Sequence, residues 1–196
     1  MKNFIIALKL VVLMTILLGI VYPLVITGIT RAIFPHKTNG SLLTMNGKVI
    51  GSALIGQKFE SQRYFWSRPS AVDYNPLPSG GSNLGPTSAD LEKHITQRRS
   101  MLFAANGMSE GTIIPPDLLF ASASGLDPHI SPEAARFQVK RIVRERGFDR
   151  NGENELYKLI DRHVEPRALQ LLGEPRVNVL KLNLSLDSLG AKLERK

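Results

Sequence analysis

The chain has 196 residues, of which 43% are hydrophobic and 21% charged, with a formal net charge of +8 at pH 7 and no cysteine. Without cysteine, disulfide bonds, thiolate metal sites and cysteine nucleophiles are excluded. The excess of Lys and Arg suits an anionic partner or a membrane surface, and it also suits an ordinary solvated surface; we expect no nucleic-acid partner. The length accommodates one domain and a small additional element.

The N-terminal part contains an uncharged apolar run over residues 10–30. As an α-helix this run would span roughly 31 Å, close to the ~30 Å thickness of a bilayer core. It exceeds the apolar region of a signal peptide, which usually has about 7 to 15 residues. The sequence therefore predicts a short tail over 1–9, a transmembrane helix over 10–34 and a soluble domain over 35–196.

The predicted transmembrane helix contains residues that suit packing against other helices. Pro23 lacks an amide proton and predicts a kink, while Gly19 and Gly28 would let a neighbouring helix approach closely. The alternative is a lone anchor in which these residues meet no partner. Lys and Arg are almost equally frequent near both ends, so the positive-inside rule distinguishes the two orientations poorly. The very short tail favours a cytoplasmic N-terminus and an extracytoplasmic soluble domain.

The soluble part opens with a predicted β-hairpin over residues 41–59. Two β-prone runs flank Asn46 and Gly47, the residue pair most typical of a two-residue hairpin turn. Two regions rich in Ser, Pro and Gly follow over 67–88 and 111–137, and they predict long loops. Long loops in compact domains are often functional, so these regions are the first candidates for a site.

About four helices are predicted in the soluble part, from N-cap residues, helical periodicity and terminal glycines. One or two further turns of helix are expected over 167–172. The C-terminal segment fits both strand alternation and helical periodicity; the helical pattern covers more residues, so we favour a helix. The fold class is therefore α+β, with one transmembrane helix before a single small mixed α/β domain that contains a β-hairpin. The predicted helices cover 87–107, 131–146, 153–164 and 178–193.

The sequence contains no convincing catalytic or metal-binding motif. The histidines show no metal-ligand spacing on one element and no HExxH motif, so we predict no metal site. Ser122, Ser124 and His129 would suit a membrane-anchored hydrolase, but no GxSxG elbow accompanies them and a shaped loop explains the stretch better. We assign no catalytic residue. The four histidines are His36, His94, His129 and His163.

A Ser-Gly-Gly-Ser run lies shortly before the first predicted helix of the domain. Glycines ahead of a helix N-terminus can bind a phosphate, but the run lacks the GK[ST] ending that supplies a phosphate-binding lysine. A contact loop ahead of a capped helix is the favoured interpretation, and direct nucleotide binding is the alternative. The possible nucleotide contacts are Ser79, Gly80, Gly81, Ser82 and Asn83.

Five blocks of sequence, in order behind the single N-terminal span, resemble the C subunit of the bacterial Kdp potassium-transporting ATPase. The resemblance extends over nearly the whole chain. The blocks are GSALIGQKF (51–59), YFWSRPSA (64–71), YNPLPSGGSNLGPTS (74–88), SASGLDPHISPEAA (122–135) and VNVLKLNLSLD (177–187).

The resemblance implies a non-catalytic accessory subunit of an ATP-driven K⁺ uptake complex in the bacterial inner membrane. Its partners would be the lipid bilayer, a channel-like K⁺-translocating subunit and a P-type subunit that hydrolyses ATP. In the family the soluble part is placed outside the cytoplasm, and the subunit is described as a catalytic chaperone that raises ATP affinity, with a Ser-Gly-Gly loop touching nucleotide. ATP is thus the one cofactor implied, yet a domain outside the cytoplasm cannot reach cytoplasmic ATP. Any effect on ATP affinity would then have to pass through the membrane helices.

We expect the Gly- and Pro-rich loops to contact the partner subunits, in a steric or coupling role. A basic domain near a cation entrance would not attract K⁺ electrostatically. The predicted contact residues are Tyr64, Trp66, Arg68, Pro69, Asn75, Pro76, Ser124, Gly125, Leu126 and Asp127.

Overall fold

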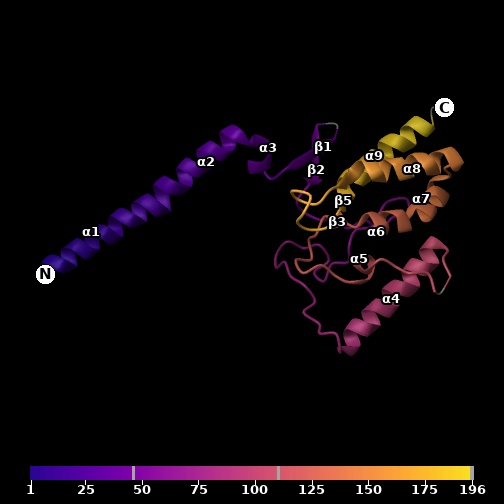
Figure 1. The fold of residues 1–196 in the computed structure, drawn as a ribbon, viewed down its shortest axis with the longest axis horizontal. Helices are drawn as coiled ribbons and strands as arrows, with labels where there is room; N and C mark the ends of the chain where they lie inside the picture. Colours follow the sequence, from indigo (N-terminus) through magenta and orange to yellow (C-terminus); the bar gives the residue numbers. More distant parts are fainter. Residues whose placement is uncertain (46, 110, 195–196) are drawn as a thin grey trace. The chain divides into compact units, whose positions relative to one another are not determined.

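A computed structural model of the chain describes residues 1–45, 47–109 and 111–194 (Figure 1). The chain forms two compact units, Met1–Ile50 and Gly51–Lys196. The first unit holds the N-terminal helix and most of a β-hairpin, and the second holds the domain that contains the candidate site.

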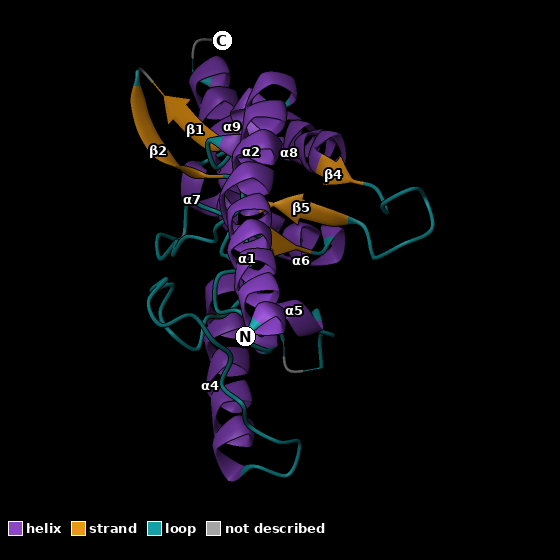
Figure 2. Cartoon of the chain, turned by 90° about the vertical axis from the view of Figure 1, so that its left-hand side faces the viewer, coloured by secondary structure: helices purple, strands orange, loops and turns teal. Residues whose placement is uncertain are grey.

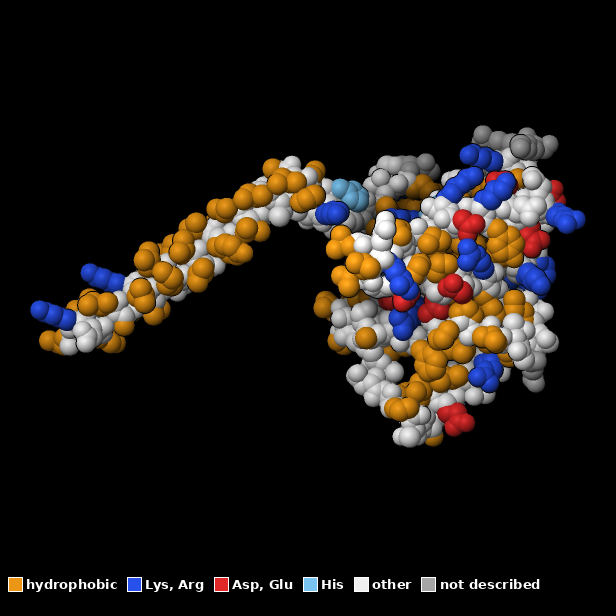
Figure 3. All heavy atoms as spheres, in the orientation of Figure 1, with side chains coloured by type: hydrophobic (Ala, Val, Ile, Leu, Met, Phe, Trp, Pro, Cys, Tyr) orange, Lys and Arg blue, Asp and Glu red, His pale blue; other side chains and the backbone are white. Residues whose placement is uncertain are grey.

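The first unit begins with one long helix over Lys2–Ile33, which is long and apolar enough to cross a membrane. Apolar side chains cover its length, and none of its residues is buried (Figure 3). The predicted tail is therefore itself helical, because residues 2–9 contain no helix breaker. The helix consists of α1 (Lys2–Ile16), the π-helical turn η1 (Leu17–Val21) and α2 (Tyr22–Ile33).

The helix continues across Pro23 and adapts to it with the π-helical turn. The amide of Tyr22 donates to the carbonyl of Leu17, five residues earlier, and Pro23 follows at the start of α2. A π-turn is one of the usual ways in which a helix accommodates a residue without an amide proton. The structure thus shows a π-helical turn before Pro23, and the predicted kink stays a prediction.

The predicted hairpin is confirmed and is shorter than the segment that predicted it. Strand β1 (Leu42–Met45) pairs with β2 (Lys48–Ser52), after a short helix α3 (Pro35–Thr38). Gly47 has a φ of +76°, the left-handed conformation that a tight turn requires. Asn46 lies outside the described residues.

Two helices of the domain begin where the sequence predicts, because their N-cap side chains close the first turn. In α4 (Ala89–Asn106) the Ser88 hydroxyl accepts from the amide of Leu91 at 3.4 Å. In α9 (Val179–Leu193) the side-chain oxygen Oδ1 of Asn178 accepts from the amide of Lys181 at 3.1 Å. The C-terminal segment is therefore a helix, as favoured.

Other predicted helices differ from the structure. The helix over 131–146 is divided into α6 (Pro132–Phe137) and α7 (Val139–Arg146) by a turn at Gln138, whose amide donates to the carbonyl of Ala135, three residues earlier, at 3.1 Å. The helical turns predicted over 167–172 were wrong: Ala168 and Leu172 form a β-bridge that closes a non-helical turn.

Two more helices complete the helical part of the domain. Helix α8 (Arg150–His163) starts earlier than predicted, because Asp149 caps it by accepting from the amide of Gly152 at 2.7 Å. The short helix α5 (Pro116–Leu119) lies in the second predicted loop region and begins with proline at its first position.

A three-stranded antiparallel sheet, unpredicted from the sequence, joins distant segments. Strand β5 (Arg176–Asn178) lies between β3 (His129–Ile130) and β4 (Val164–Glu165). Its register pairs Asn178 with His129 and Val177 with Val164. Strands of two or three residues are too short to show the alternation that identifies a strand in sequence.

The core of the domain lies among the three-stranded sheet and helices α4 to α9, with Phe65 contributed by the segment before the first long loop (Figures 1 and 2). Helix α8 packs against both α7 and α9, and each of α6, α8 and α9 contacts β5. The apolar residues at most 2% exposed include Phe65, Leu102, Val139, Ile142, Leu156, Ile160, Val177, Val179, Leu182 and Leu186.

Candidate functional site

The segment that leads into the first long loop is held by two buried side-chain amides. Phe65 donates its amide proton to Asn183 Oδ1 at 2.9 Å, and Asn183 Nδ2 donates to the carbonyl of Phe65 at 3.0 Å. Gln138 makes the same pair of bonds with Trp66, at 2.7 and 3.2 Å. Asn183 and Gln138 are at most 1% exposed. These amides take the place of a neighbouring strand and determine where the loop begins.

Two arginines hold the aromatic residues of the same segment. The guanidinium of Arg141 lies 4.0 Å from the Trp66 ring and donates to Gln138 Oε1 at 2.7 Å. Burial lowers the pKa of Arg141 to about 10, so the side chain stays cationic at neutral pH. Arg146 lies 4.9 Å from the Tyr64 ring. Tyr64 and Trp66 thus have bonds within the domain, and their contact with a partner stays a prediction.

Residues 67–83 and 122–127 form one surface, which we term the loop platform. The amide of Ser122 donates to the carbonyl of Pro69 at 3.1 Å, and the amide of Gly80 donates to the carbonyl of Ser124 at 2.9 Å. The two loops are far apart in sequence, yet these backbone bonds bring the Ser-Gly-Gly run against the second predicted loop. Most of the predicted contact residues therefore belong to a single surface.

Glycines allow the two loops of the platform to touch. Gly125 has a φ of +69°, and a Cβ there would lie 2.5 Å from Val72 Cγ2 and 2.8 Å from the carbonyl oxygen of Gly80. A Cβ on Gly81 would lie 3.1 Å from the carbonyl oxygen of Ala123. Only glycine fits Gly125 without displacing a neighbour, since both its conformation and its surroundings exclude a side chain.

The outer edge of the platform is shaped by local hydrogen bonds. The Tyr74 hydroxyl donates to the carbonyl of Arg68 at 2.6 Å, and burial raises the pKa of Tyr74 to about 12, which keeps this donor protonated. Asn75 Oδ1 accepts from the amide of Leu77 at 3.1 Å. Asn75 and Pro76 are exposed, as a partner contact requires.

The Ser-Gly-Gly run does not have the arrangement of a phosphate-binding loop. The amide of Gly80 is already bonded to Ser124, and helix α4 begins only at Ala89, where Ser88 caps it. In a phosphate loop the glycine amides are free and the helix follows directly. The exposed side chains of Ser82 and Asn83 leave nucleotide contact as an untested prediction.

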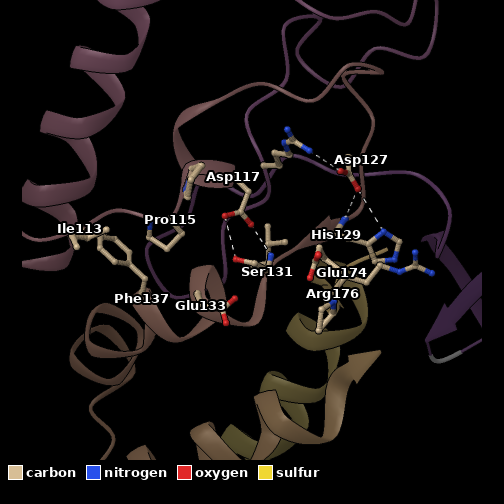
Figure 4. A pocket seen from close by; sticks show the side chains of 14 residues that line it. Ile113, Pro115, Asp117, Asp127, His129, Ser131, Glu133, Phe137, Glu174 and Arg176 are labelled. Atoms are coloured by element: carbon tan, nitrogen blue, oxygen red, sulfur yellow. Dashed lines mark hydrogen bonds and ion pairs between the residues drawn. The ribbon is translucent and has the colours of Figure 1, made fainter. Parts of the chain in front are cut away.

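A series of acidic, basic and histidine side chains lies at one side of the platform, and Figure 4 shows part of it. Arg68 pairs with Asp127 at 3.3 Å, and Asp127 lies 3.5 Å from His129 Nδ1. Burial opposes ionisation of Asp127, but hydrogen bonds from His129 and Arg68 outweigh it and hold its pKa below the ordinary value. The other ring nitrogen of His129 lies 3.8 Å from Glu165, which pairs with Arg176 at 3.1 Å. These side-chain contacts connect the platform to all three strands, through His129 of β3, Glu165 of β4 and Arg176 of β5.

An open cavity of about 880 Å³ lies beside these paired side chains. Arg68 and Asp127 border the cavity on the side of the platform. Glu174, which precedes β5, and Arg176, the first residue of β5, border it on another side (Figure 4). In its wall Asp117 accepts from the amide of Ser131 at 2.6 Å, which fixes the start of α6. The cavity and the platform are therefore one continuous surface.

Comparison with known proteins identifies the family. The family model described as "K+-transporting ATPase, c chain", KdpC, matches residues 4–188. The chain belongs to the KdpC family. Proteins named potassium-transporting ATPase KdpC subunit are similar to it over most of their length. Those of Geobacter metallireducens, Koribacter versatilis and Geotalea uraniireducens are 50%, 48% and 52% identical, over 93%, 95% and 91% of this chain and 96%, 94% and 93% of the relative.

Membership of the KdpC family confirms the resemblance predicted from the five sequence blocks. It identifies the chain as a potassium-transport subunit, and the single apolar helix over Lys2–Ile33 is consistent with a single-pass membrane protein. Four of the five blocks contribute residues to the platform or to the amides that hold it; they are the blocks over 64–71, 74–88, 122–135 and 177–187.

The serines suggested for a hydrolase do not meet a histidine in this KdpC chain. Within the described ranges, Ser122 and Ser124 form no hydrogen bond with His129, whose ring faces Asp127 and Glu165. Among the same residues, no group of three His, Asp or Glu could hold a metal ion.

Sequence reasoning missed a Ser–His pair and the amides of Asn183 and Gln138. Ser185 Oγ lies 2.9 Å from His163 Nε2, and the other ring nitrogen of His163 bonds the carbonyl of Leu159, which joins α9 to α8. Nothing in the spacing of these residues announces the contacts. The one usable signal was Asn183, a polar residue within the apolar stripe of the C-terminal helix.

Proposed function

We propose that this chain is a non-catalytic accessory subunit of an ATP-driven K⁺ uptake complex and that ATP hydrolysis lies in another subunit. The loop platform contacts the channel-like and P-type subunits, and the helix over Lys2–Ile33 anchors the chain in the inner membrane. The observation that carries the proposal is the platform itself: two loops of a KdpC-family chain, closed on each other by backbone bonds and by Gly125, with exposed residues at the edge.

The chemistry of the platform supports binding in preference to catalysis. The backbone bonds between its two loops and the Arg68–Asp127 pair are formed within the domain, so the surface is ordered before a partner arrives. A preordered surface loses little conformational entropy on binding, which favours a stable subunit contact. We propose that any effect on the ATP affinity of the P-type subunit is a coupling free energy transmitted through the membrane helices.

Removal of the chain tests the proposal. We expect the other subunits, expressed without it, to lose most K⁺-stimulated ATPase activity, and the full-length chain to restore activity when it is supplied from a second plasmid. The measurement is phosphate release with and without K⁺, together with the subunit composition of the affinity-purified complex. Full K⁺-stimulated activity in the absence of the chain would refute an accessory role.

The proposed orientation predicts different labelling at the two ends of the chain. Because native cysteine is absent, Ser82→Cys and Asn3→Cys each introduce a single reactive thiol. In intact cells or spheroplasts we expect a membrane-impermeant maleimide to label the chain at position 82 at once, and at position 3 only after permeabilisation. The opposite pattern would place the domain in the cytoplasm and would reopen the question of direct ATP contact.

A further inference from the structure

The loop between β4 and β5, residues 166–175, exposes a cluster of leucines and is termed here the leucine loop. Leu169, Leu171 and Leu172 are 85%, 81% and 65% exposed. Figure 2 shows the loop extending beyond the strands that it joins. Single exposed leucines are common on protein surfaces, but a cluster on one projecting loop marks an interaction site.

The leucine loop has a defined shape. The amide of Ala168 donates to the carbonyl of Leu172, and the amide of Leu172 donates to the carbonyl of Ala168, both at 2.9 Å. Leu169 and Gln170 have φ values of 52° and 62°, a conformation unfavourable for residues with side chains. The loop therefore holds its apolar tip outward at a cost in free energy, where burial against a partner would stabilise it.

The charges around the loop favour a protein partner over a lipid surface. Arg167 pairs with Glu174 at 2.7 Å, and Glu165 pairs with both Arg176 at 3.1 Å and Lys181 at 3.4 Å, so each of these charged groups at the base of the loop has a partner of opposite charge. Elements that bind anionic bilayers carry an excess of uncompensated Lys and Arg around their apolar side chains. A balanced base suits an uncharged apolar groove.

The leucine loop is continuous with the loop platform. Glu174 and Pro175 at its C-terminal end, and Arg176 directly after it in β5, border the same cavity as Arg68 and Asp127 (Figure 4). A partner segment that lies on the platform and enters the cavity would therefore meet the loop as well.

We propose that the leucine loop docks into an uncharged apolar groove on another subunit of the K⁺-transporting complex, as an extension of the surface formed by the platform and the cavity. The proposal rests on the accessory role proposed above. Leu169, Leu171 and Leu172 carry the contact together, because all three are exposed. Leu171 and Leu172 are the pair to substitute, because Leu169 has a φ of 52° and a change there would also alter the strained backbone of the loop.

The test is a full-length Leu171→Ala/Leu172→Ala variant expressed with the other subunits. Both leucine side chains would be buried on docking, so their loss is expected to weaken binding to the other subunits about tenfold to a hundredfold. Val49→Ala, which removes an exposed apolar side chain from the hairpin, is the matched control and is expected to bind like the parent chain. Unchanged affinity of the double variant overturns the proposal, whereas failure of the parent chain to bind would refute the accessory role instead.

A polarity-sensitive dye on a Leu171→Cys variant separates a protein groove from a bilayer. We expect its emission to shift to the blue when the other subunits are present, and to stay that of an exposed dye when the chain is alone in vesicles containing anionic lipid. A blue shift in those vesicles without other subunits would show insertion into lipid and overturn the proposal. An unshifted emission in the assembled complex would overturn it as well.

Discussion

Gly125→Ala is expected to destabilise the domain by about 2 to 5 kcal/mol and to abolish assembly with the other subunits. Gly125 has a φ of +69°, where a residue with a side chain is unfavourable by roughly 1 to 2 kcal/mol. The new Cβ would also lie 2.5 Å from Val72 and 2.8 Å from the Gly80 carbonyl, which forces the two loops of the platform apart. Overpacking of this kind typically adds about 1 to 3 kcal/mol.

Gly85→Ala is the matched control for this prediction. A Cβ there meets nothing within 4 Å, and Gly85 lies just beyond the platform. We expect Gly85→Ala to change the free energy of unfolding by less than about 1 kcal/mol and to leave assembly intact. The measurements are urea unfolding of the detergent-solubilised full-length chain and copurification with the other subunits. Equal behaviour of the two variants would contradict the close packing of the platform loops.

Asn183→Ala is expected to lower the free energy of unfolding by about 2 to 5 kcal/mol. The substitution leaves both the amide and the carbonyl of Phe65 without their hydrogen-bond partner in a buried place. Each buried group without a partner is unfavourable by roughly 1 to 3 kcal/mol. Because this segment leads directly into the platform, assembly should weaken in parallel with stability.

Ser188→Ala is the control on the same helix, since the exposed hydroxyl of Ser188 donates to the Leu184 carbonyl one turn away and bonds no other group among the described residues. We expect it to change stability by no more than about 0.5 kcal/mol. Thermal and urea unfolding of the full-length chain would compare the two variants. An Asn183→Ala chain as stable as the Ser188→Ala chain would mean that water, or a shift of the segment, replaces the lost bonds.

Local signals explain which parts of the fold could be predicted. The apolar run over 10–30, the hairpin around Gly47 and the caps at Ser88 and Asn178 each depend on residues close in sequence. Such features follow from side-chain polarity and backbone preference, which act over a few residues.

Predictions failed where a distant contact decided the local structure. The predicted helix over 131–146 is divided at Gln138, the residue whose side chain is bonded to Trp66 from another part of the chain. The strands β3, β4 and β5 exist only as partners of one another, and the turn over 167–172 is closed by its own bridge in place of a helix.

The candidate site divides in the same way. Its composition was visible, since loops rich in Gly, Pro and Ser in KdpC-like blocks indicated a contact surface, and the lack of a phosphate-binding lysine argued against a nucleotide loop. Its extent was not visible, because the bond from Gly80 to Ser124, the packing around Gly125 and the outward leucines depend on how remote segments meet.

The sequence by itself thus determined the long apolar N-terminal helix, the starts of the capped helices and the family, and it supplied the predicted contact residues. Only the tertiary structure decided that the two loops form one platform, that Asn183 and Gln138 hold its entrance and that the leucine loop borders the same cavity. The physical reason is that polarity and backbone preference act within a few residues. Contacts between remote segments form only when the whole core is packed, and no local pattern records them.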